Sequence, residues 1–265
     1  ARRLPPGDYF FMWQVEPSVI VGRNQLIDNE VNMEFCRQHG IRLFRRKSGG
    51  GCVYADLSNV MFSYITSEQQ VGFTFNRYLT MLISMLQRMG IDASATGRND
   101  VMMGNRKVSG NAFYRIPGRS ILHGTMLYDT DMINMVGSIT PSGEKLLTKG
   151  ILSVHQRIAL LKNYTHMTLD EFKDFARKTL CDTERQLTAE DIRNIEQIER
   201  EYLADSFIYG KNPAYSIVKK RYIKGVGELE VRMEVKNGII KDVDLTGDYF
   251  LTGDLDSGLL AKLRG

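Results

Sequence analysis

The chain has no long apolar run and little cysteine. No stretch of its 265 residues approaches the roughly 20 apolar residues of a membrane-spanning helix. Its first residues lack the apolar segment of a signal peptide, so we expect a cytoplasmic protein without membrane contacts. Cys36, Cys52 and Cys181 form no Cys-x-x-Cys pair, which argues against a disulfide framework or a zinc site.

The usual nucleotide-binding signatures are absent too. The sequence contains neither a Gly-x-x-x-x-Gly-Lys-Ser/Thr loop nor a Gly-x-Gly-x-x-Gly fingerprint. A net charge of +4 without a dense basic run gives no reason to expect a nucleic acid partner. With 43% hydrophobic and 25% charged residues, the composition is that of a globular protein. Its length suits one large domain, alone or with a small partner domain.

The most informative segment is residues 45–51, Arg-Arg-Lys-Ser-Gly-Gly-Gly. Three consecutive glycines let the backbone adopt positive φ and let its N–H groups approach an anion closely. Arg45 and Arg46 add forked donors that suit phosphate or carboxylate oxygens. These residues alone predict an anion site no better than they predict a bulge or a flexible loop.

Short strands and helices are expected on both sides of this segment. Two strands broken at Pro17 are predicted within residues 9–25, followed by a helix capped by Asp28 or Asn29. Strands are also expected at residues 41–44 and 60–65. The apolar spacing after Thr74 predicts an amphipathic helix that Thr74 caps and Gly90 ends.

Two polar residues fall on strands that the sequence predicts to be neighbours. A Gly-Asn turn at residues 104–105 joins two strand-like runs, and Lys107 follows it directly. A third run covers residues 121–128 and contains His123. A hairpin or meander would place Lys107 and His123 on adjacent strands.

The second half of the chain begins with an aperiodic stretch. Residues 139–163 predict a mobile loop that closes over a ligand. Capping boxes at Thr168 and Thr188 predict two helices, the second with Ile192, Ile195, Ile198 and Tyr202 facing inward. Beyond residues 211–213, alternating apolar and charged residues predict a hairpin with one buried face.

Four separated stretches together resemble the lipoate-protein ligases. They are residues 19–25 (Val-Ile-Val-Gly-Arg-Asn-Gln), residues 45–51, residues 97–112 with Gly-Arg-Asn-Asp and Lys-Val-Ser-Gly-Asn-Ala, and residues 123–125 (His-Gly-Thr). Residues 209–215 and the hairpin that follows resemble the accessory domain of the bacterial enzymes. Each piece is weak alone, whereas the combination in this order is specific.

The resemblance implies a fold and an activity. The fold is mixed α/β (α+β): a biotin and lipoate ligase type catalytic domain over residues 1–211, with mixed and antiparallel sheets flanked by helices, and a small α+β accessory domain over residues 212–265. The implied enzyme joins lipoate to ATP, giving lipoyl-AMP and pyrophosphate. It then transfers the lipoyl group to a lysine of an acceptor domain.

The resemblance also implies roles for individual residues. Lys107 is expected to be the catalytic lysine, contacting the lipoate carboxyl and the α-phosphate. The expected ATP-binding residues are Arg46, Gly51, Cys52, Val53, Tyr54, Lys107 and Lys149. The expected lipoate-binding residues are Arg45, Ser48, Gly49, Gly50, Lys107, His123 and Gly124. For His123, a buried, hydrogen-bonded histidine is the competing interpretation.

The expected cofactors are ATP and Mg²⁺, with lipoate as substrate. Asn99 and Asp100 are candidates for holding Mg²⁺ or receiving the acceptor amine's proton, although an Asx turn explains the pair equally well. The implied partners are lipoyl acceptor domains of 2-oxoacid dehydrogenase E2 subunits and the H protein of the glycine cleavage system. We expect a monomer without nucleic acid or membrane partners.

Three other functions compete with this interpretation. An octanoyl or lipoyl transferase of the same fold would work through a cysteine thioester without ATP, and Cys52 is its candidate nucleophile. The Lys-Val-Ser-Gly motif and the accessory hairpin favour the ligase. A non-catalytic acyl-binding protein is expected to lack Lys107 or the paired arginines, and biotin ligation is disfavoured because the Gly-Arg-Gly-Arg-x-Gly signature is absent.

Overall fold

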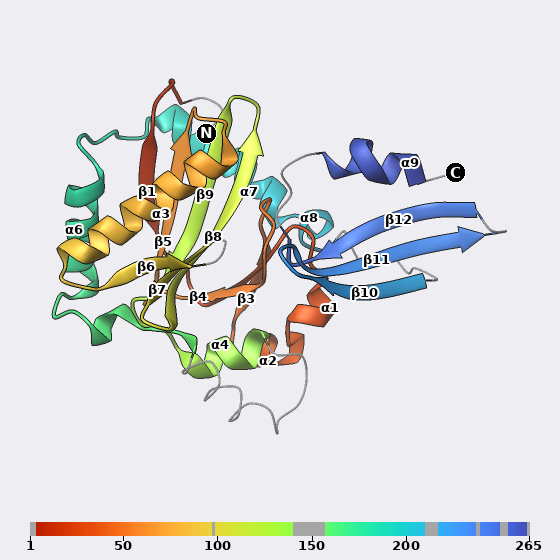
Figure 1. Ribbon diagram of the computed structural model, residues 1–265, viewed down its shortest axis with the longest axis horizontal. Coiled ribbons are helices and arrows are strands. Elements are labelled where there is room, and N and C mark those ends of the chain that lie inside the picture. The colour runs from red at the N-terminus through yellow and green to blue at the C-terminus, as the bar shows by residue number, and fades with distance from the viewer. Residues whose placement is uncertain are drawn as a thin grey trace.

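The computed structural model describes residues 4–96, 99–139, 157–209, 217–236, 239–249 and 254–263. A six-stranded and a three-stranded sheet form the body, and the C-terminal segment contributes a second three-stranded sheet beside it (Figure 1). In the described part of the chain, no helix is long and apolar enough to cross a membrane. The α/β class and the mixed and antiparallel sheets are as predicted.

The six-stranded sheet has the order β1-β5-β9-β8-β7-β6, and every neighbouring pair is antiparallel. The strands are β1 (Tyr9–Trp13), β5 (Val60–Thr66), β6 (Ala93–Thr96), β7 (Asp100–Met103), β8 (Arg106–Ile116) and β9 (Arg119–Met126). The turn between β7 and β8 contains Gly104 at φ 59°, a left-handed conformation that glycine adopts easily. The prediction that Lys107 and His123 lie on adjacent strands is confirmed, because β8 pairs with β9.

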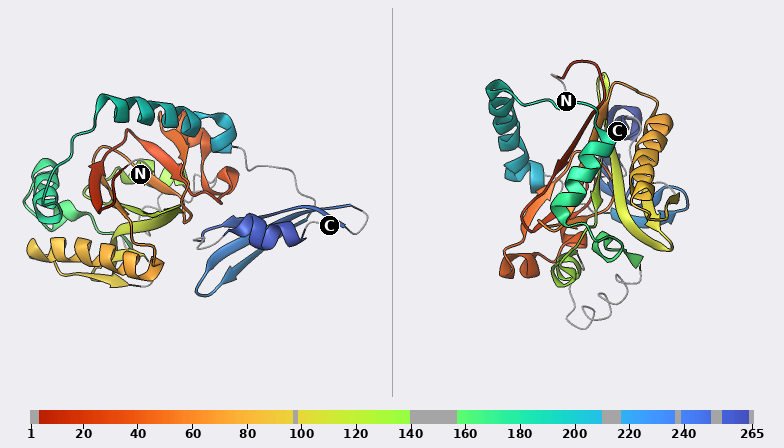
Figure 2. Two further views of the ribbon diagram at one scale, coloured as in Figure 1. Left: turned by 90° about the horizontal axis from the view of Figure 1, so that it is seen from above. Right: turned by 90° about the vertical axis from the view of Figure 1, so that its left-hand side faces the viewer.

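The main core lies between this sheet and two helices, α3 (Val71–Arg88) and α6 (Leu169–Leu180) (Figures 1 and 2). Phe62, Tyr78 and Phe172 are fully buried there. Burying each large apolar side chain stabilises the fold by about 1.5–3 kcal/mol. The predicted cap at Thr74 is wrong: the helix begins at Val71, and the Thr74 hydroxyl donates back to the Gln70 carbonyl at 2.8 Å.

The smaller sheet carries the glycine-rich segment. Its order is β3-β2-β4, with β3 (Arg42–Arg45) parallel and β4 (Val53–Ala55) antiparallel to β2 (Ser18–Val21). β2 is buried on both faces, with Val19 and Val21 in one apolar cluster and Ile20 in another. Residues 46–52 therefore connect the ends of two strands that flank a fully buried one.

Short helices pack beside this sheet. The single helix predicted after residue 28 is instead two, α1 (Ile27–Glu30) and α2 (Met33–Gln38). Asn32 caps the second, accepting from the Phe35 N–H at 3.1 Å, so the predicted caps Asp28 and Asn29 are wrong. The helix α4 (Met132–Ile139) packs against α2 and β4.

Two further helices, α7 (Ala189–Leu203) and α8 (Asp205–Tyr209), follow α6. The capping boxes predicted at Thr168 and Thr188 are both present. The inward orientation predicted for the α7 isoleucines is wrong. Ile192, Ile195 and Ile198 are 48%, 50% and 50% exposed.

The accessory sheet is an antiparallel meander of β10 (Ile217–Ile223), β11 (Gly227–Lys236) and β12 (Ile239–Gly247). The predicted hairpin is β11 and β12, whereas β10 was not predicted. The predicted exposed charged face is wrong at Glu230, which is 6% exposed. A π-helical turn (Asp256–Leu260) and α9 (Ala261–Leu263) lie above it (Figure 1). The predicted domain boundary, between residues 211 and 212, lies outside the described residues.

Candidate active site

Lys107 stands near the start of β8, where it pairs with Met102, and its side chain reaches Asp100 at the start of β7. Its Nζ lies 2.8 Å from the Asp100 carboxylate, and the two side chains are 39% and 30% exposed. A register shift between β7 and β8 falls between Val101 and Met102, beside Lys107. On the other side, the Lys107 carbonyl accepts from the Ala159 N–H at 2.8 Å. The backbone of Lys107 is thus fixed while its ammonium stays accessible.

The Lys107 side chain folds over Gly110. A Cβ placed on Gly110 would lie 2.7 Å from the Lys107 Nζ, closer than real contacts allow, so the glycine makes room for the ammonium. Gly110 pairs with Thr125 on β9, and Ala112 pairs with His123. Side chains of opposed residues, and of residues two apart on a strand, project from the same face of a sheet. The ammonium and the His123 ring therefore lie on one face.

His123 links that face to the glycine bend, which we define as residues 48–51. Its Nε2 lies 2.6 Å from the Ser48 Oγ. Burial, together with the Arg46 charge, lowers the pKa of His123 to about 4, so the ring is neutral at physiological pH. Lys107 and His123 thus share one face of the β8–β9 pair, and His123 contacts the glycine bend through Ser48.

Arg46 stabilises the glycine bend through hydrogen bonds to three of its residues. Its Nη2 donates to the Gly49 carbonyl at 2.9 Å and the Gly51 carbonyl at 2.7 Å, and its Nε donates to Ser48 at 3.1 Å. Gly50 has φ 89°, which allows the bend to present both carbonyls to one guanidinium. Burial lowers the pKa of Arg46 to about 10, which leaves it charged at neutral pH. A fixed positive charge therefore underlies the bend.

Arg45 points to the opposite side of β3, as alternation along a strand requires. Its side chain is 4% exposed in relative area. The guanidinium donates to the carbonyls of Gly22, Gln25 and Ile208 at 2.9, 2.8 and 2.7 Å. These bonds join the turn after β2 to α8, so Arg45 shapes the surroundings of the glycine bend.

Two asparagines hold the start of β7 against β8. The Asn99 side chain donates to the Asn111 carbonyl at 2.7 Å, and the Asn111 side chain donates to the Asn99 carbonyl at 2.9 Å. This clasp fixes the backbone just before Asp100, the partner of Lys107. Asn111 was not among the predicted site residues, although it falls within the Lys-Val-Ser-Gly-Asn-Ala motif.

Cys52 and Tyr54 carry the chain from the glycine bend into β4. Burial, with a smaller contribution from the nearby Glu30 carboxylate, raises the pKa of the Cys52 thiol to about 12. Tyr54 is 2% exposed and belongs to the apolar cluster around β2. The thiol is therefore protonated at neutral pH, which makes it a poor nucleophile.

Comparison with known proteins identifies the family. Residues 1–181 match the family model described as the lipoyl protein ligase A/B catalytic domain, and residues 212–265 match the bacterial lipoate protein ligase C-terminus. The chain belongs to the lipoate-protein ligase family.

Two relatives and one solved structure illustrate this membership. The lipoate-protein ligase LplJ of Bacillus subtilis is 34% identical over 267 residues, covering 96% of this chain and 80% of that protein. The lipoate-protein ligase 1 of Staphylococcus aureus is 34% identical over 263 residues, with the same coverage of 96% and 80%. The structure of P. falciparum LipL1 in complex with lipoate has a TM-score of 0.72 and 25% identity, covering 98% of this chain and 76% of LipL1.

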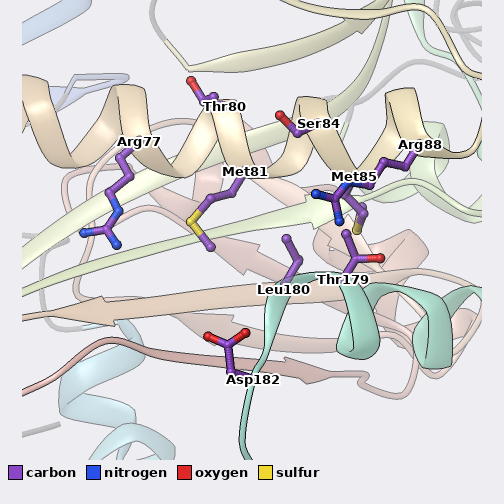
Figure 3. Close-up of a pocket in the computed structure, with 9 residues that line it drawn as sticks. All are labelled: Arg77, Thr80, Met81, Ser84, Met85, Arg88, Thr179, Leu180 and Asp182. Atoms are coloured by element: carbon purple, nitrogen blue, oxygen red, sulfur yellow. The ribbon is translucent and has the colours of Figure 1, made fainter.

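The remaining residues predicted for a lipoate-protein ligase site fall in three places. Gly124 pairs with Asn111 beside His123, and Val53 pairs with Ile20 in the small sheet. Lys149, like Lys145 and most of the predicted loop, lies outside the described residues. A cavity of about 430 Å³ between α3 and α6, lined by residues such as Arg77, Met81 and Leu180, contains none of the predicted site residues (Figure 3).

Proposed function

We propose that this member of the lipoate-protein ligase family activates lipoate with ATP, giving lipoyl-AMP and pyrophosphate, and transfers the lipoyl group to a lysine of an acceptor protein. The observation that carries this proposal is the position of the Lys107 ammonium. It lies over Gly110, on the sheet face from which His123 reaches Ser48. The Lys107 ammonium thus lies on the same face of the β8–β9 pair as His123, which contacts the glycine bend that Arg46 supports.

The first step requires a cation between two anions. A carboxylate and a phosphate charge about 4 Å apart repel by about 1 kcal/mol in water and about 4 kcal/mol near a protein surface. The Lys107 ammonium can turn from Asp100 to bridge the lipoate carboxylate and the α-phosphate. The carboxylate oxygen then attacks that phosphorus, and pyrophosphate leaves.

The second step uses the same charge. When the acceptor amine attacks the acyl carbon of lipoyl-AMP, negative charge develops on the carbonyl oxygen, and an ammonium nearby stabilises it. The acceptor lysine must first lose a proton. We assign Asp100 as the group that receives it, because its carboxylate already adjoins Lys107 at 2.8 Å.

We assign the nucleotide to the side of the site formed by the glycine bend and β4. The proposed ATP-binding residues are Arg46, Gly51, Cys52, Val53, Tyr54, Lys107 and Lys149. Arg46 would act through its charge across the bend, because its described hydrogen bonds go to Ser48 and to backbone carbonyls. Backbone N–H groups of a glycine-rich bend suit phosphate oxygens.

We assign lipoate to the neighbouring surface of the bend and β9. The proposed lipoate-binding residues are Arg45, Ser48, Gly49, Gly50, Lys107, His123 and Gly124. A neutral His123 and unsubstituted glycines suit an apolar chain that ends in a carboxylate. Arg45 would contribute indirectly, through the turn after β2 that it holds.

Asp100 also fits a Mg²⁺ ion that accompanies ATP. Among the described residues, no group of three His, Cys, Asp or Glu side chains could form a metal site of its own. Mg²⁺ in nucleotide enzymes needs fewer protein ligands, because one or two carboxylates act with the substrate phosphates and water. As the alternative to its role as proton acceptor, Asp100, with Asn99 beside it, would hold the ion, which would neutralise phosphate charge.

The proposed acceptors are lipoyl domains of 2-oxoacid dehydrogenase E2 subunits and the glycine cleavage H protein. We further propose a cytoplasmic monomer whose catalytic domain covers residues 1–211 and whose accessory domain covers residues 212–265. The match of residues 212–265 to the bacterial C-terminal model supports that division.

The transferase alternative requires a reactive thiolate. With a pKa of about 12, Cys52 is almost entirely protonated at pH 7. Its environment therefore favours the ligase.

One assay tests the proposal. The purified chain is incubated with lipoate, Mg²⁺ and an isolated lipoyl domain, with and without ATP, and the acceptor's mass is measured. We expect lipoylation in the presence of ATP, with AMP and pyrophosphate as products. No lipoylation with ATP, or transfer from an added lipoyl thioester donor that proceeds equally well without nucleotide, would overturn the proposal.

A further inference from the structure

The end of the accessory sheet contacts the glycine bend directly. We call residues 247–249, at the end of β12, the accessory tip. The Gly50 N–H donates to the Tyr249 carbonyl at 3.1 Å, and the Gly247 N–H donates to the Asn24 carbonyl at 2.8 Å. Figure 1 shows this end of the sheet beside α8 and α1. One backbone donor of the bend is therefore already occupied by the protein itself.

The carboxylate of Asp248 covers the next residue of the bend. A Cβ placed on Gly51 would lie 3.3 Å from one Asp248 carboxylate oxygen and 3.6 Å from the other. The Asp248 N–H donates to the Glu228 carbonyl at 3.0 Å, and Tyr249 is 3% exposed with its hydroxyl donating to the Leu245 carbonyl at 2.6 Å. The backbone around Asp248 is thus anchored, while its side chain is exposed over Gly51.

At this contact, a carboxylate of the protein lies where a bound anion would lie. Arg46 bonds the Gly49 and Gly51 carbonyls, and the Asp248 carboxylate lies beside the position that a Gly51 Cβ would take. Other acidic groups lie near: burial raises the pKa of Glu30, Lys220 opposes that rise, and Asp248 and Glu228 add to it. A phosphate entering here would meet a negative group of the protein.

We propose that the accessory tip is a built-in competitor of the nucleotide. The Asp248 carboxylate and the Tyr249 carbonyl take the positions at Gly50 and Gly51 that phosphate oxygens would use, so ATP binds only as the tip withdraws. This inference rests on the proposed function, which assigns the phosphates to the glycine bend. Asp248 thereby lowers the affinity for ATP without taking part in the reaction.

The test is ATP binding to the full chain without lipoate, measured by calorimetry for wild type and Asp248→Asn. Removing one opposed charge is expected to tighten ATP binding about fivefold at low salt, with a smaller gain at high salt. Asp248→Glu, which keeps the charge, should bind like wild type. Glu234→Gln is the matched control, because it removes the same charge about 20 Å further along β11 and should change nothing.

Hydrogen exchange supplies a second readout. Saturating ATP is expected to speed amide exchange at Gly247 of wild type, because its N–H loses the Asn24 carbonyl when the tip leaves the bend. Unchanged or weaker ATP binding by Asp248→Asn, or ATP-induced protection of Gly247, would overturn the inference. If wild type lipoylates its acceptor and these outcomes are seen, this inference alone fails. A wild-type chain that neither binds ATP nor lipoylates would overturn the proposed function as well.

Discussion

Two cationic groups of the candidate site, Arg46 and Lys107, are held in contrasting ways. Arg46 is tied to Ser48 and to the carbonyls of the glycine bend, whereas Lys107 is 39% exposed and adjoins one carboxylate of Asp100. A guanidinium bonded to backbone carbonyls shapes a loop, but an ammonium in a half-exposed ion pair can move to a substrate. The contrast indicates that Arg46 shapes the glycine bend, and it supports the proposal that Lys107 takes part in the chemistry.

The largest effect is expected from Lys107→Ala. Lipoate-dependent ATP–pyrophosphate exchange should fall by about a thousandfold, as when a donor that stabilises transition-state charge is removed. The unfolding free energy should change by at most about 1 kcal/mol, because the ion pair is half-exposed. Lys162→Ala is the matched control, since Lys162 is 42% exposed and lies 2.6 Å from Asp129. If Lys107→Ala retained ATP–pyrophosphate exchange, the proposed difference in role between Lys107 and Arg46 would be wrong.

Arg45→Met tests whether a buried arginine that is bonded to backbone carbonyls stabilises the fold. The unfolding free energy, measured by urea denaturation, should fall by about 3–5 kcal/mol, because buried carbonyls lose their charged donor. Arg42→Met on the same strand is the control. Arg42 is exposed and stacks over Phe44 at 4.9 Å, so its loss should cost at most about 1 kcal/mol. Equal destabilisation by both variants would show that burial of Arg45 contributes little.

His123 lies on the sheet face of Lys107 and contacts the glycine bend at Ser48. Its protonation makes the free energy of unfolding depend on pH. Its pKa is about 4 in the folded chain, below the ordinary value of 6.5, so the unfolded chain takes up this proton first as pH falls. Stability is therefore lost below pH 6.5, by about 2 kcal/mol at pH 5. His123→Gln should abolish this part of the slope in urea titrations between pH 7 and 5, and His166→Gln at an exposed position should preserve it. A slope unchanged in His123→Gln would contradict this.

The smallest effect is expected from Cys52→Ser. Because the thiol stays protonated, we expect less than about a twofold change in the lipoylation rate, equivalent to about 0.4 kcal/mol. Mass spectrometry of the enzyme during turnover should find no acyl adduct on Cys52. A trapped thioester together with loss of activity would instead favour the transferase.

Local signals predicted the parts of the fold that depend on nearby residues. The Gly-Asn turn joins β7 to β8, the strand that carries Lys107 and pairs with β9, and both capping boxes formed where Thr168 and Thr188 predicted them. These features rest on hydrogen bonds between residues a few positions apart. Their prediction needed no knowledge of the distant chain.

Features decided by distant residues could not be predicted. α6 buries Phe172 and Ala176 against the main core, whereas the similar apolar stripe of α7 stays exposed. A stripe shows which face is apolar but not whether another element covers it. Likewise, Arg45 and Arg46 look alike in sequence. Arg45 is fixed by the Ile208 carbonyl, which is 163 residues away.

The most direct test of the account is a crystal structure with a stable analogue of lipoyl-AMP. The Lys107 Nζ is expected within about 3 Å of both the acyl oxygen and an oxygen at the phosphate position. The analogue should also lie against the glycine bend. An analogue bound away from the β8–β9 face, with Lys107 still paired to Asp100, would contradict it.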